Sequence, residues 1–432
     1  MTKKMQKAPL GNPQETTDTE DLSFLVLQGL ASPFFKLLAA NLAQADARVH
    51  RVNFCGGDWW FAGRKSKRLS HGRLNVPALK TREPYLKLIQ DRAITDIILF
   101  GDCRPIHTSA RVIAAEHDLR IWVFEEGYLR PGSITCEKIG TNDLSTVPRD
   151  IGLITARAAT LREAAEEQAL PETAAIPNTA NPMPPRVRME VALHLWNLLL
   201  KPFYYHYRSH RPHTLGEELK GWFTRFRRKL SYGKRNMTLV SRYEKAEDLF
   251  FLVPLQLNSD FQVREHSDYE SVLDFISDVA LSFSKHAPKN CHLLFKGHPL
   301  DNGMIDYRNF IAMAAIKHGI QKRVNYIEGG NLDKLLAHAE GIVMINSTVG
   351  YAALKKSKPI KVMGRALYNM AGLTDQKKLD KFWKRPVAPT PTAVSDFMYV
   401  IKADTQITGD FYTDQGVAQA AQLAAERILS DR

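Results

Sequence analysis

Long apolar runs and paired cysteines are both missing from this chain of 432 residues. No stretch of 18 or more apolar residues occurs, so we expect no helix that spans a membrane. Residues 1–21 lack the apolar segment of a secretory signal, so we expect no such signal. They are polar, and we expect a flexible N-terminus there. The four cysteines form no C-x-x-C pair, which argues against a disulfide framework or a structural zinc site and favours a reducing cytoplasm.

Two common nucleotide and metal motifs are absent as well. The chain contains neither a G-x-x-x-x-G-K-[ST] phosphate loop nor an H-E-x-x-H zinc helix. His206, His210 and His213 are closely spaced, but Arg208 and Arg211 lie beside them, which favours a cationic surface over a metal site. We therefore expect no resident metal ion and no other cofactor.

Positive charge is what the chain has in excess. It contains 59 Lys and Arg against 46 Asp and Glu, a formal net charge of +13. Residues 186–235 concentrate this charge, with 12 Lys and Arg against 3 Glu, and they also hold nine aromatic residues. Such an excess indicates an anionic partner, which is a membrane surface, a nucleic acid or a phosphorylated substrate.

Short apolar runs alternate with helix-length amphipathic stretches in both halves of the chain. Examples are Ile97–Phe100 and Ile121–Phe124 in the first half, and Phe250–Leu255 and Gly341–Ile345 in the second. Runs of this kind, closed by polar turns, are typical of parallel strands covered on both faces. The sequence therefore predicts an α/β protein with two Rossmann-like domains.

Composition divides the chain into five parts. The stretch Pro171–Pro185 holds five prolines and reads as a linker between the two halves. We expect a flexible N-terminus over 1–21, a first Rossmann-like domain over 22–170, the linker with a basic aromatic segment over 171–240, a second Rossmann-like domain over 241–385, and a helical tail over 386–432.

Two turns at predicted strand ends in the second half suit a phosphate group. The first places Lys296 and His298 on either side of a glycine. The second runs from Asn346 through Ser347 and Thr348 into a predicted helix. Hydroxyl residues at the start of a helix either cap it or, together with backbone N–H groups, form an anion site. Ligands of open α/β sheets bind beyond the carboxyl ends of strands, so these turns favour a nucleotide-linked ligand.

Acidic residues follow other predicted strands. Glu125 and Glu126 end one run, Asp260 lies beyond another, and Asp102 follows a third. Each is more often part of a capped turn than a catalytic group. A pair of carboxylates facing one cleft supplies a nucleophile and a general acid/base at a sugar centre, which here requires the two halves to close on each other.

The basic aromatic segment has the pattern of an amphipathic helix. Trp222, Phe223 and Phe226 recur at helical spacing, with Arg225 and Arg228 among the basic residues around them. This pattern favours a membrane-facing helix, because anionic lipids attract basic side chains. Stacking on nucleic acid, and a helix that covers a domain with snorkelling Lys and Arg, are the alternatives.

Five motifs, taken in order, resemble the capsule polysaccharide synthesis and export family, most closely its KpsS/LipA-type β-Kdo transferases. They are FGDCRPIH at 100–107, FEEGYLRP at 124–131, VPLQLNSDFQ at 253–262, KGHP at 296–299 and NSTVG at 346–350. The resemblance implies a GT-B-like fold, with two Rossmann-like domains facing a cleft and a helical basic insertion between them.

The resemblance also implies an activity. It is a retaining glycosyltransferase that moves Kdo from CMP-Kdo to a (lyso)phosphatidylglycerol acceptor, and so initiates the glycolipid linker for capsule polysaccharide export in Gram-negative bacteria. Such an enzyme is peripheral on the inner face of the inner membrane. Its partners are an anionic phospholipid, a CMP-sugar and, as further candidates, capsule export proteins.

Site roles follow from the matched motifs. Asp260 matches the nucleophile, and Glu125 matches the acid/base, with Glu126 as the second choice. Asp102 and Arg104 lie in a loop on the acceptor side. The expected donor-binding residues are Lys296, His298, Asn346, Ser347, Thr348 and Gln256.

Two other functions stay open. CDP-polyol phosphotransferases share the GT-B build, an HP-like turn and a basic membrane-docking surface, but they need no carboxylate nucleophile. A non-catalytic scaffold of the capsule export complex would bind lipid or sugar without turnover. A nucleic-acid role is more distant, because the basic segment contains no recognisable RNA or DNA module.

Overall fold

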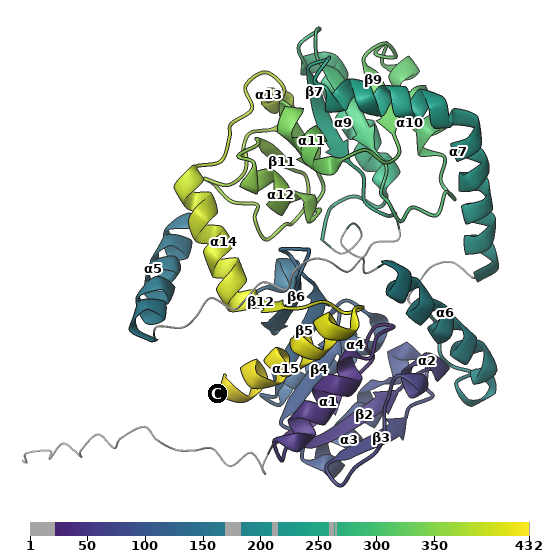
Figure 1. The fold of residues 1–432 in the computed structure, drawn as a ribbon, viewed down its shortest axis with the longest axis vertical. Helices are drawn as coiled ribbons and strands as arrows, with labels where there is room; N and C mark the ends of the chain where they lie inside the picture. Colours follow the sequence, from purple (N-terminus) through teal and green to yellow (C-terminus); the bar gives the residue numbers. More distant parts are fainter. Residues whose placement is uncertain (1–21, 169–182, 210–214, 259–262, 264–265, 432) are drawn as a thin grey trace, which may run out of the picture.

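The computed structural model describes residues 22–168, 183–209, 215–258, 263 and 266–431. Asp260, the expected nucleophile, lies outside these residues, as do His210 and His213. The chain forms two α/β halves, the lower and the upper one in Figure 1, and each half is built around its own sheet. The α/β architecture predicted from the sequence is confirmed.

The first sheet is formed mainly by the N-terminal half. Its strands within the described residues are β1 (Ser23–Val26), β2 (Arg48–Asn53), β3 (Leu69–Arg73), β4 (Asp96–Phe100), β5 (Arg120–Glu126), β6 (Ser133–Lys138) and β12 (Gln406–Thr408). They lie in the order β12-β6-β5-β4-β1-β2-β3, parallel from β5 to β3, with β6 and β12 antiparallel at one edge. Strands β1 and β4 are buried along their whole length, which explains their continuous apolar sequence.

The second sheet is parallel throughout. Its described strands are β7 (Phe250–Pro254), β8 (His292–Lys296), β9 (Val324–Ile327), β10 (Gly341–Met344) and β11 (Ile360–Val362), in the order β11-β10-β7-β8-β9. If the five parallel strands of each half are numbered from one, both sheets have the Rossmann order 3-2-1-4-5.

Helices cover both faces of each sheet. On the first sheet, α1 (Phe34–Gln44) and α15 (Asp414–Ser430) share one core, while α3 (Arg82–Arg92) and α4 (Pro105–Glu116) share the opposite one. On the second sheet, α9 (Val272–His286), α10 (Tyr307–Lys317) and α13 (Leu379–Phe382) pack on one face. Its other face is covered by α11 (Leu332–His338), α12 (Val349–Lys355) and α14 (Pro391–Thr405).

The C-terminal segment returns to the first half. Strand β12 pairs with β6, and α15 lies beside α1, seen as yellow against purple in Figure 1. Between them, the ring of Phe411 meets Phe34 at 5.0 Å and Phe100 at 5.5 Å between centroids. The first sheet is therefore completed by residues from the far end of the chain.

One helix that follows the first half in the sequence packs on the second half. Helix α5 (Ile151–Gln168), which we placed in the first domain from the sequence, packs along α14, and Ile154 joins the core of the second half. Ion pairs tie the same two helices together, from Arg157 to Asp404 at 2.8 Å and from Arg162 to Asp396 at 2.7 Å.

The basic segment forms two long helices, each attached to a different half. Helix α6 (Met183–Leu199) packs on α2 (Gly56–Trp60), where the ring of Trp196 stacks on Trp60 at 4.6 Å. Helix α7 (Leu215–Glu244) packs on the second half, where Asn236 exchanges two hydrogen bonds with the backbone of Glu328. No helix in the described part of the chain is both long and apolar enough to cross a bilayer.

Candidate active site

The carboxyl ends of the two sheets form the two rims of one cleft. Arg130, beyond β5, donates a hydrogen bond to Thr348 Oγ1 of the second half at 2.8 Å. Arg365, beyond β11, forms an ion pair with Asp143 of the first half at 3.1 Å. Open α/β sheets bind ligands at these strand ends, so we build the candidate site here.

On the first rim, Glu125 has the chemistry of an acid/base. Pairing of Phe100 with Phe124 places the turn after β4 beside Glu125. Gly101 adopts φ +71° in this turn, a conformation that glycine tolerates best. Enclosure by protein raises the pKa of the Glu125 carboxyl to about 7, although the N–H of Glu126 donates to it at 3.1 Å. A carboxyl with this pKa exchanges protons efficiently near neutrality.

The carboxylate of Glu126, unlike that of Glu125, is bound by cationic and hydroxyl partners. It forms an ion pair with Arg186 of α6 at 3.3 Å and a longer one with Arg130 at 3.8 Å. The hydroxyl of Tyr412 donates to it at 2.8 Å. These partners occupy the carboxylate of Glu126, so the geometry favours Glu125 as the proton-transfer group.

Both glutamates open into a cavity of about 250 Å³. The loop after β1 and the ends of β4 and β5 form one wall, and α6 closes the other with Arg186, His194 and Asn197. Carboxylates and cations therefore line the same small space. Such a cavity suits a hydroxyl-bearing group that also carries negative charge.

Asp102 and Arg104 are buried and hold the loop after β4 in place. Arg104 donates to the carbonyl of Gly29 at 2.7 Å, and its guanidinium lies 5.0 Å from the centre of the Phe100 ring. Asp102 Oδ2 accepts from the N–H of Thr141 at 2.8 Å. Of the two acceptor-side candidates, Arg104 also lines the cavity.

On the second rim, positive charge converges on His298. Burial, together with the smaller effects of the charges of Lys296, Arg130, Arg225 and Arg186, lowers the pKa of His298 to about 4. These cations come from β8, from the loop after β5, from α7 and from α6. A cluster of cations assembled from both halves around one imidazole is suited to an anion.

Lys296 contributes a buried charge to this cluster. It is the last residue of β8 and is 7% exposed. Burial lowers the pKa of its ammonium, and no carboxylate among the described residues offsets that effect. A buried ammonium is costly without a counter-charge, which again points to an anionic ligand.

The other expected donor-binding residues connect the strand ends to one another. Gln256 and Asn346 exchange two hydrogen bonds, with the Gln256 amide donating to Asn346 Oδ1 at 3.0 Å and the Asn346 N–H donating back at 3.1 Å. Ser347 Oγ accepts from the N–H of Val349 at 3.3 Å, as a turn residue does. Thr348 carries the bond from Arg130 across the cleft.

Two arginines of α7, which the sequence placed among the membrane-facing residues, bind the loop after β8. Arg225 donates to the carbonyl of Pro299 at 3.1 Å and also to Asp301, and Arg228 donates to the carbonyl of Gly303 at 3.0 Å. They occupy the inner face of α7 and hold the loop after β8. Trp222, Phe223 and Phe226 are instead 45%, 63% and 59% exposed.

Several residues at the cleft escaped the sequence analysis. Arg130 stands inside a quoted motif but was given no role, and Arg186 was counted only as part of the basic segment. Tyr412 had no signal, because it reaches the site from the tail. His266, which meets Cys103 across the cleft at 3.4 Å, had none either.

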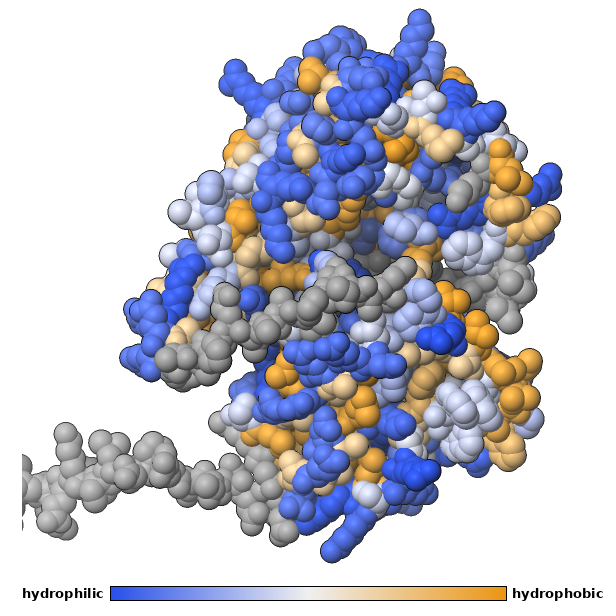
Figure 2. Space-filling view, viewed as in Figure 1, coloured by the Kyte–Doolittle hydropathy of each residue, from blue (hydrophilic) through white to orange (hydrophobic). Residues whose placement is uncertain are grey.

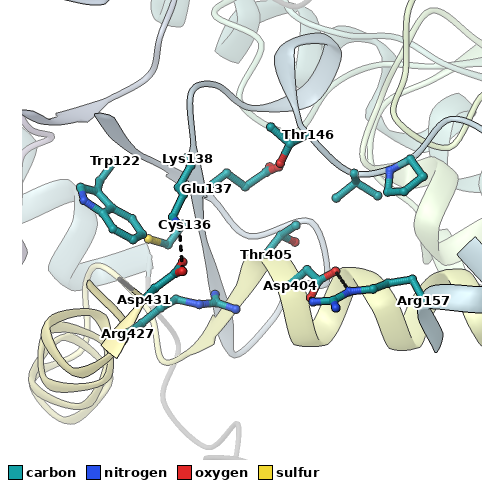
Figure 3. Close-up of a pocket in the computed structure, with 12 residues that line it drawn as sticks. Trp122, Cys136, Glu137, Lys138, Thr146, Arg157, Asp404, Thr405, Arg427 and Asp431 are labelled. Carbon is teal, nitrogen blue, oxygen red and sulfur yellow. Dashed lines mark hydrogen bonds and ion pairs between the residues drawn. The ribbon is translucent and has the colours of Figure 1, made fainter. Parts of the chain in front are cut away.

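A second cavity, of about 310 Å³, lies away from these strand ends (Figure 3). It is lined by β6, α5 and the returning C-terminal segment, with the Arg157–Asp404 pair on one side. Burial raises the pKa of Glu137 there to about 7, although Tyr128 and Ser145 donate hydrogen bonds to it. None of the residues expected at the active site lines this cavity.

Two Rossmann-like domains with a charged cleft between their strand ends define a protein of the GT-B type. The family model described as "Capsule polysaccharide biosynthesis protein" matches residues 95–412. The chain belongs to this capsule polysaccharide biosynthesis family, as its motifs suggested.

Curated relatives extend over nearly the whole chain. The capsule polysaccharide modification protein LipB of Neisseria meningitidis serogroup A is 35% identical over 397 residues, which is 90% of this chain and 92% of LipB. The capsule polysaccharide export protein KpsS of Escherichia coli is 33% identical over 395 residues, or 90% of this chain and 96% of KpsS.

Solved structures are more distant. The β-Kdo 2,7 transferase of Thermosulfurimonas dismutans KpsC is 13% identical and covers 94% of this chain and 98% of its own, with a TM-score of 0.42. HepE of Anabaena, solved with UDP and glucose, is 11% identical and covers 94% of this chain and 95% of its own, with a TM-score of 0.29.

Proposed function

We propose that the protein is a retaining β-Kdo glycosyltransferase that moves Kdo from CMP-Kdo to a (lyso)phosphatidylglycerol acceptor and so initiates the glycolipid linker for capsule polysaccharide export. The observation that carries the proposal is the set of cations around His298, which is linked to the Glu125 rim because Arg130 and Arg186 also form ion pairs with Glu126. The first group suits the phosphate of a nucleotide donor, and the second suits the hydroxyl of an acceptor.

Donor binding falls to the second half. Lys296 and His298 would contact the CMP phosphate, with Arg130 reaching it from the first half. Ser347 and Thr348 would line the same phosphate, while the Gln256–Asn346 pair fixes the strand ends beneath it. These cations balance the charge of the departing CMP, so the proposal requires no metal ion.

Retention of configuration requires two displacements. In the sequence, Asp260 follows β7, the central strand of the second sheet. In the proposed first step its carboxylate attacks the anomeric carbon while the bond to CMP breaks. In the second step the acceptor oxygen attacks the same carbon and Asp260 leaves. Glu125 takes the proton of the acceptor hydroxyl.

The acceptor would reach the cavity along α6. The outer face of this helix exposes Val191, Leu195 and Leu198, each more than half exposed, while its inner face lines the cavity with Arg186 and His194. Figure 2 shows apolar residues gathered along the right-hand edge, over α6 and α7. A lipid whose chains lie in a membrane could thus present its head group to Glu125. The proposed location is the inner face of the inner membrane.

The test is transfer to a lipid, followed by mass spectrometry. We would incubate the full-length protein with CMP-Kdo generated in situ and a short-chain phosphatidylglycerol, and look for a lipid heavier by one Kdo. Asp260→Asn should abolish the product. Asp333→Ala is the matched control, because that aspartate is 78% exposed and lies in α11, and it should leave the yield unchanged.

Each failure has its own meaning. Product formed by Asp260→Asn at the wild-type rate would remove Asp260 as the nucleophile and leave Kdo transfer itself standing. Absence of product with CMP still bound would overturn the sugar or the lipid acceptor. Absence of both product and CMP binding would support a non-catalytic scaffold of the capsule export complex.

A further inference from the structure

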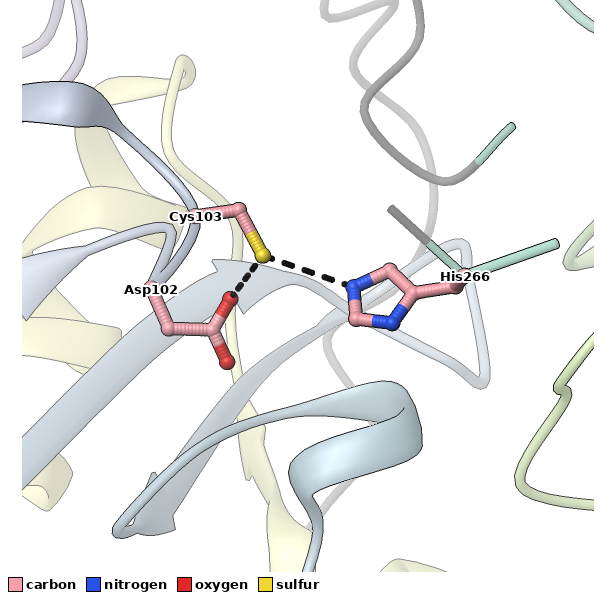
Figure 4. A group of neighbouring side chains, drawn as sticks. All are labelled: Asp102, Cys103 and His266. Atoms are coloured by element: carbon pink, nitrogen blue, oxygen red, sulfur yellow. Dashed lines mark hydrogen bonds between the residues drawn. The ribbon is translucent and has the colours of Figure 1, made fainter. Parts of the chain in front are cut away.

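Three side chains that are typical metal ligands meet where the two halves touch. Asp102 and Cys103 lie in the loop after β4, and His266 lies between β7 and α9 (Figure 4). The sulfur of Cys103 is 3.3 Å from Asp102 Oδ1 and 3.4 Å from His266 Nε2. One donor atom from each residue lies within 4.8 Å of the others.

Surrounding contacts hold Asp102 and His266 in place. The backbone N–H of Thr141 donates to Asp102 Oδ2 at 2.8 Å, which leaves Oδ1 facing the sulfur. The carbonyl of His266 accepts from the N–H of Arg365 at 2.8 Å and from the Asn346 amide at 3.1 Å. The cluster is therefore arranged before any ligand binds, which lowers the cost of binding.

The imidazole of His266 is also oriented as a ligand would be. Its side chain is 5% exposed, and Nδ1 lies 3.7 Å from the carboxylate of Asp143, on the side away from the sulfur. That distance exceeds a normal hydrogen bond, and among the described residues Nδ1 has no hydrogen-bond partner. A histidine that binds a metal through one nitrogen commonly has a carboxylate at the other.

We propose that Asp102, Cys103 and His266 form a site for Zn²⁺ or a similar borderline-soft divalent cation, which bridges the two halves of the protein. Tetrahedral zinc with bonds of about 2.0–2.3 Å separates its ligand atoms by about 3.3–3.6 Å, close to both distances at the sulfur. One thiolate, one imidazole and one carboxylate select such a cation over Mg²⁺ or Ca²⁺, which prefer oxygen ligands.

Binding at this site would act on the cleft rather than on the transfer reaction. The cation replaces the proton of the Cys103 thiol, which passes to solvent, and joins the loop after β4 to the second half. Asp102 and Cys103 belong to one half and His266 to the other, so opening of the cleft would break a metal bond. The site is thus a clamp that restrains the closed arrangement of the two halves.

Titration of the metal-free full-length protein with Co²⁺ tests the ligand set. One equivalent per chain should bind and produce a thiolate-to-cobalt charge-transfer band, and Zn²⁺ should displace it. In Cys103→Ser the band should vanish, and in His266→Ala the affinity should fall by more than about tenfold, since a ligand contributes at least as much as its hydrogen-bonding partners.

Two control variants separate this site from others. Cys291→Ser removes a buried thiol and His117→Gln an exposed imidazole, and both should keep the wild-type band. A band that survives Cys103→Ser, or one that is lost in Cys291→Ser, would overturn the proposal. Absence of any thiolate band in a folded wild-type protein would overturn it as well.

Hydrogen exchange of the wild-type protein tests the bridge without any substitution. Zn²⁺ should slow exchange both at residues 101–104 and at residues 266–268, because the cation restrains both sides together. Slowing on one side only would reject a bridging site. Neither the cobalt band nor hydrogen exchange depends on Kdo transfer. Failure of the metal-site proposal can therefore be distinguished from failure of the proposed enzyme activity.

Discussion

The two halves share a topology but not a chemistry. Both sheets have the same order of parallel strands, and both present their carboxyl ends to one cleft. In the first half these ends carry Glu125 and Glu126, whereas in the second half they carry Lys296 and His298. The topology thus determines where these residues lie, and the residues at the strand ends determine which charge each half presents to the cleft.

The halves also differ in what completes them. The first half takes β12 and α15 from the C-terminus, and the second takes α5 from the first half. Each core therefore includes a segment from the other part of the sequence. The cleft lies between two bodies that are joined by these crossings, and the ion pairs of α5 with α14 attach one crossing helix to the second half.

The largest expected effect is on kcat in a variant of Glu125, and it tests whether proton transfer and donor binding belong to different halves. Glu125→Gln should lower kcat by about 10²–10⁴-fold, the usual contribution of a general base, and leave CMP affinity unchanged. In the wild type, kcat/KM should fall as the pH drops below about 7, because the base must be ionised. The measurement is the pH–rate profile of both proteins.

Glu126→Gln is the reference for this experiment. Because Glu126 is paired with Arg186, its substitution should keep the inflection of Glu125 but move it below pH 7, since the charge of Glu126 helps to raise the pKa of Glu125. Loss of that inflection in Glu126→Gln, with its survival in Glu125→Gln, would reverse the two assignments. Equal loss of CMP binding in both variants would contradict the division of work between the halves.

The second prediction concerns the shared cores. Phe411→Ala removes a ring of the tail that is 1% exposed and packs against Phe34 and Phe100, so it should lower the free energy of unfolding by about 3–5 kcal/mol. Hydrogen exchange should accelerate in the first sheet. Phe283→Ala, in the core of the second half, is the matched control and should accelerate exchange in the second sheet instead.

Exchange that rises equally in both sheets for both variants would show that the halves unfold as one unit. The two halves would then form a single cooperative domain and would not be two coupled bodies that unfold separately.

The smallest expected effect is a pH dependence of CMP binding. His298 is neutral at pH 7 in the free protein, because burial and neighbouring cations hold its pKa at about 4. A phosphate placed beside it raises that pKa, so the affinity for CMP should increase by up to about tenfold as the pH falls from 7 to 5. Calorimetry in two buffers would also report proton uptake.

The phosphate of CMP titrates over part of this range, so His298→Gln provides the baseline. The affinity of this variant should follow only the charge of the nucleotide. Identical pH profiles for the wild type and His298→Gln would place the phosphate away from His298.

Much of the fold was predictable because strands covered on both faces appear as apolar runs. The runs that correspond to β4, β5, β7 and β10 were identified in this way, and so were the turns that follow them. These patterns are local in the sequence. The anion turn at Lys296 and the acidic strand end at Glu125 could be named for the same reason.

What could not be predicted depends on contacts between distant residues. The charge pattern of α7 indicated a basic surface, but it did not show that Arg225 and Arg228 hold the loop after β8. The pairing of Cys103 with His266 spans 163 positions, and neither residue stands in a metal-ligand spacing. The contribution of Tyr412 to the cavity required the return of the tail, which no local pattern encodes.

That return has a consequence for synthesis on the ribosome. Residues 22–138 emerge early, yet the face of their sheet that α15 covers stays without its helix until residues 414–430 have left the exit tunnel. The apolar side chains of α1 that α15 later buries are exposed meanwhile, and exposed apolar surface of this kind promotes aggregation. Nascent chains stalled before residue 406 should therefore bind chaperones more strongly than released full-length chains.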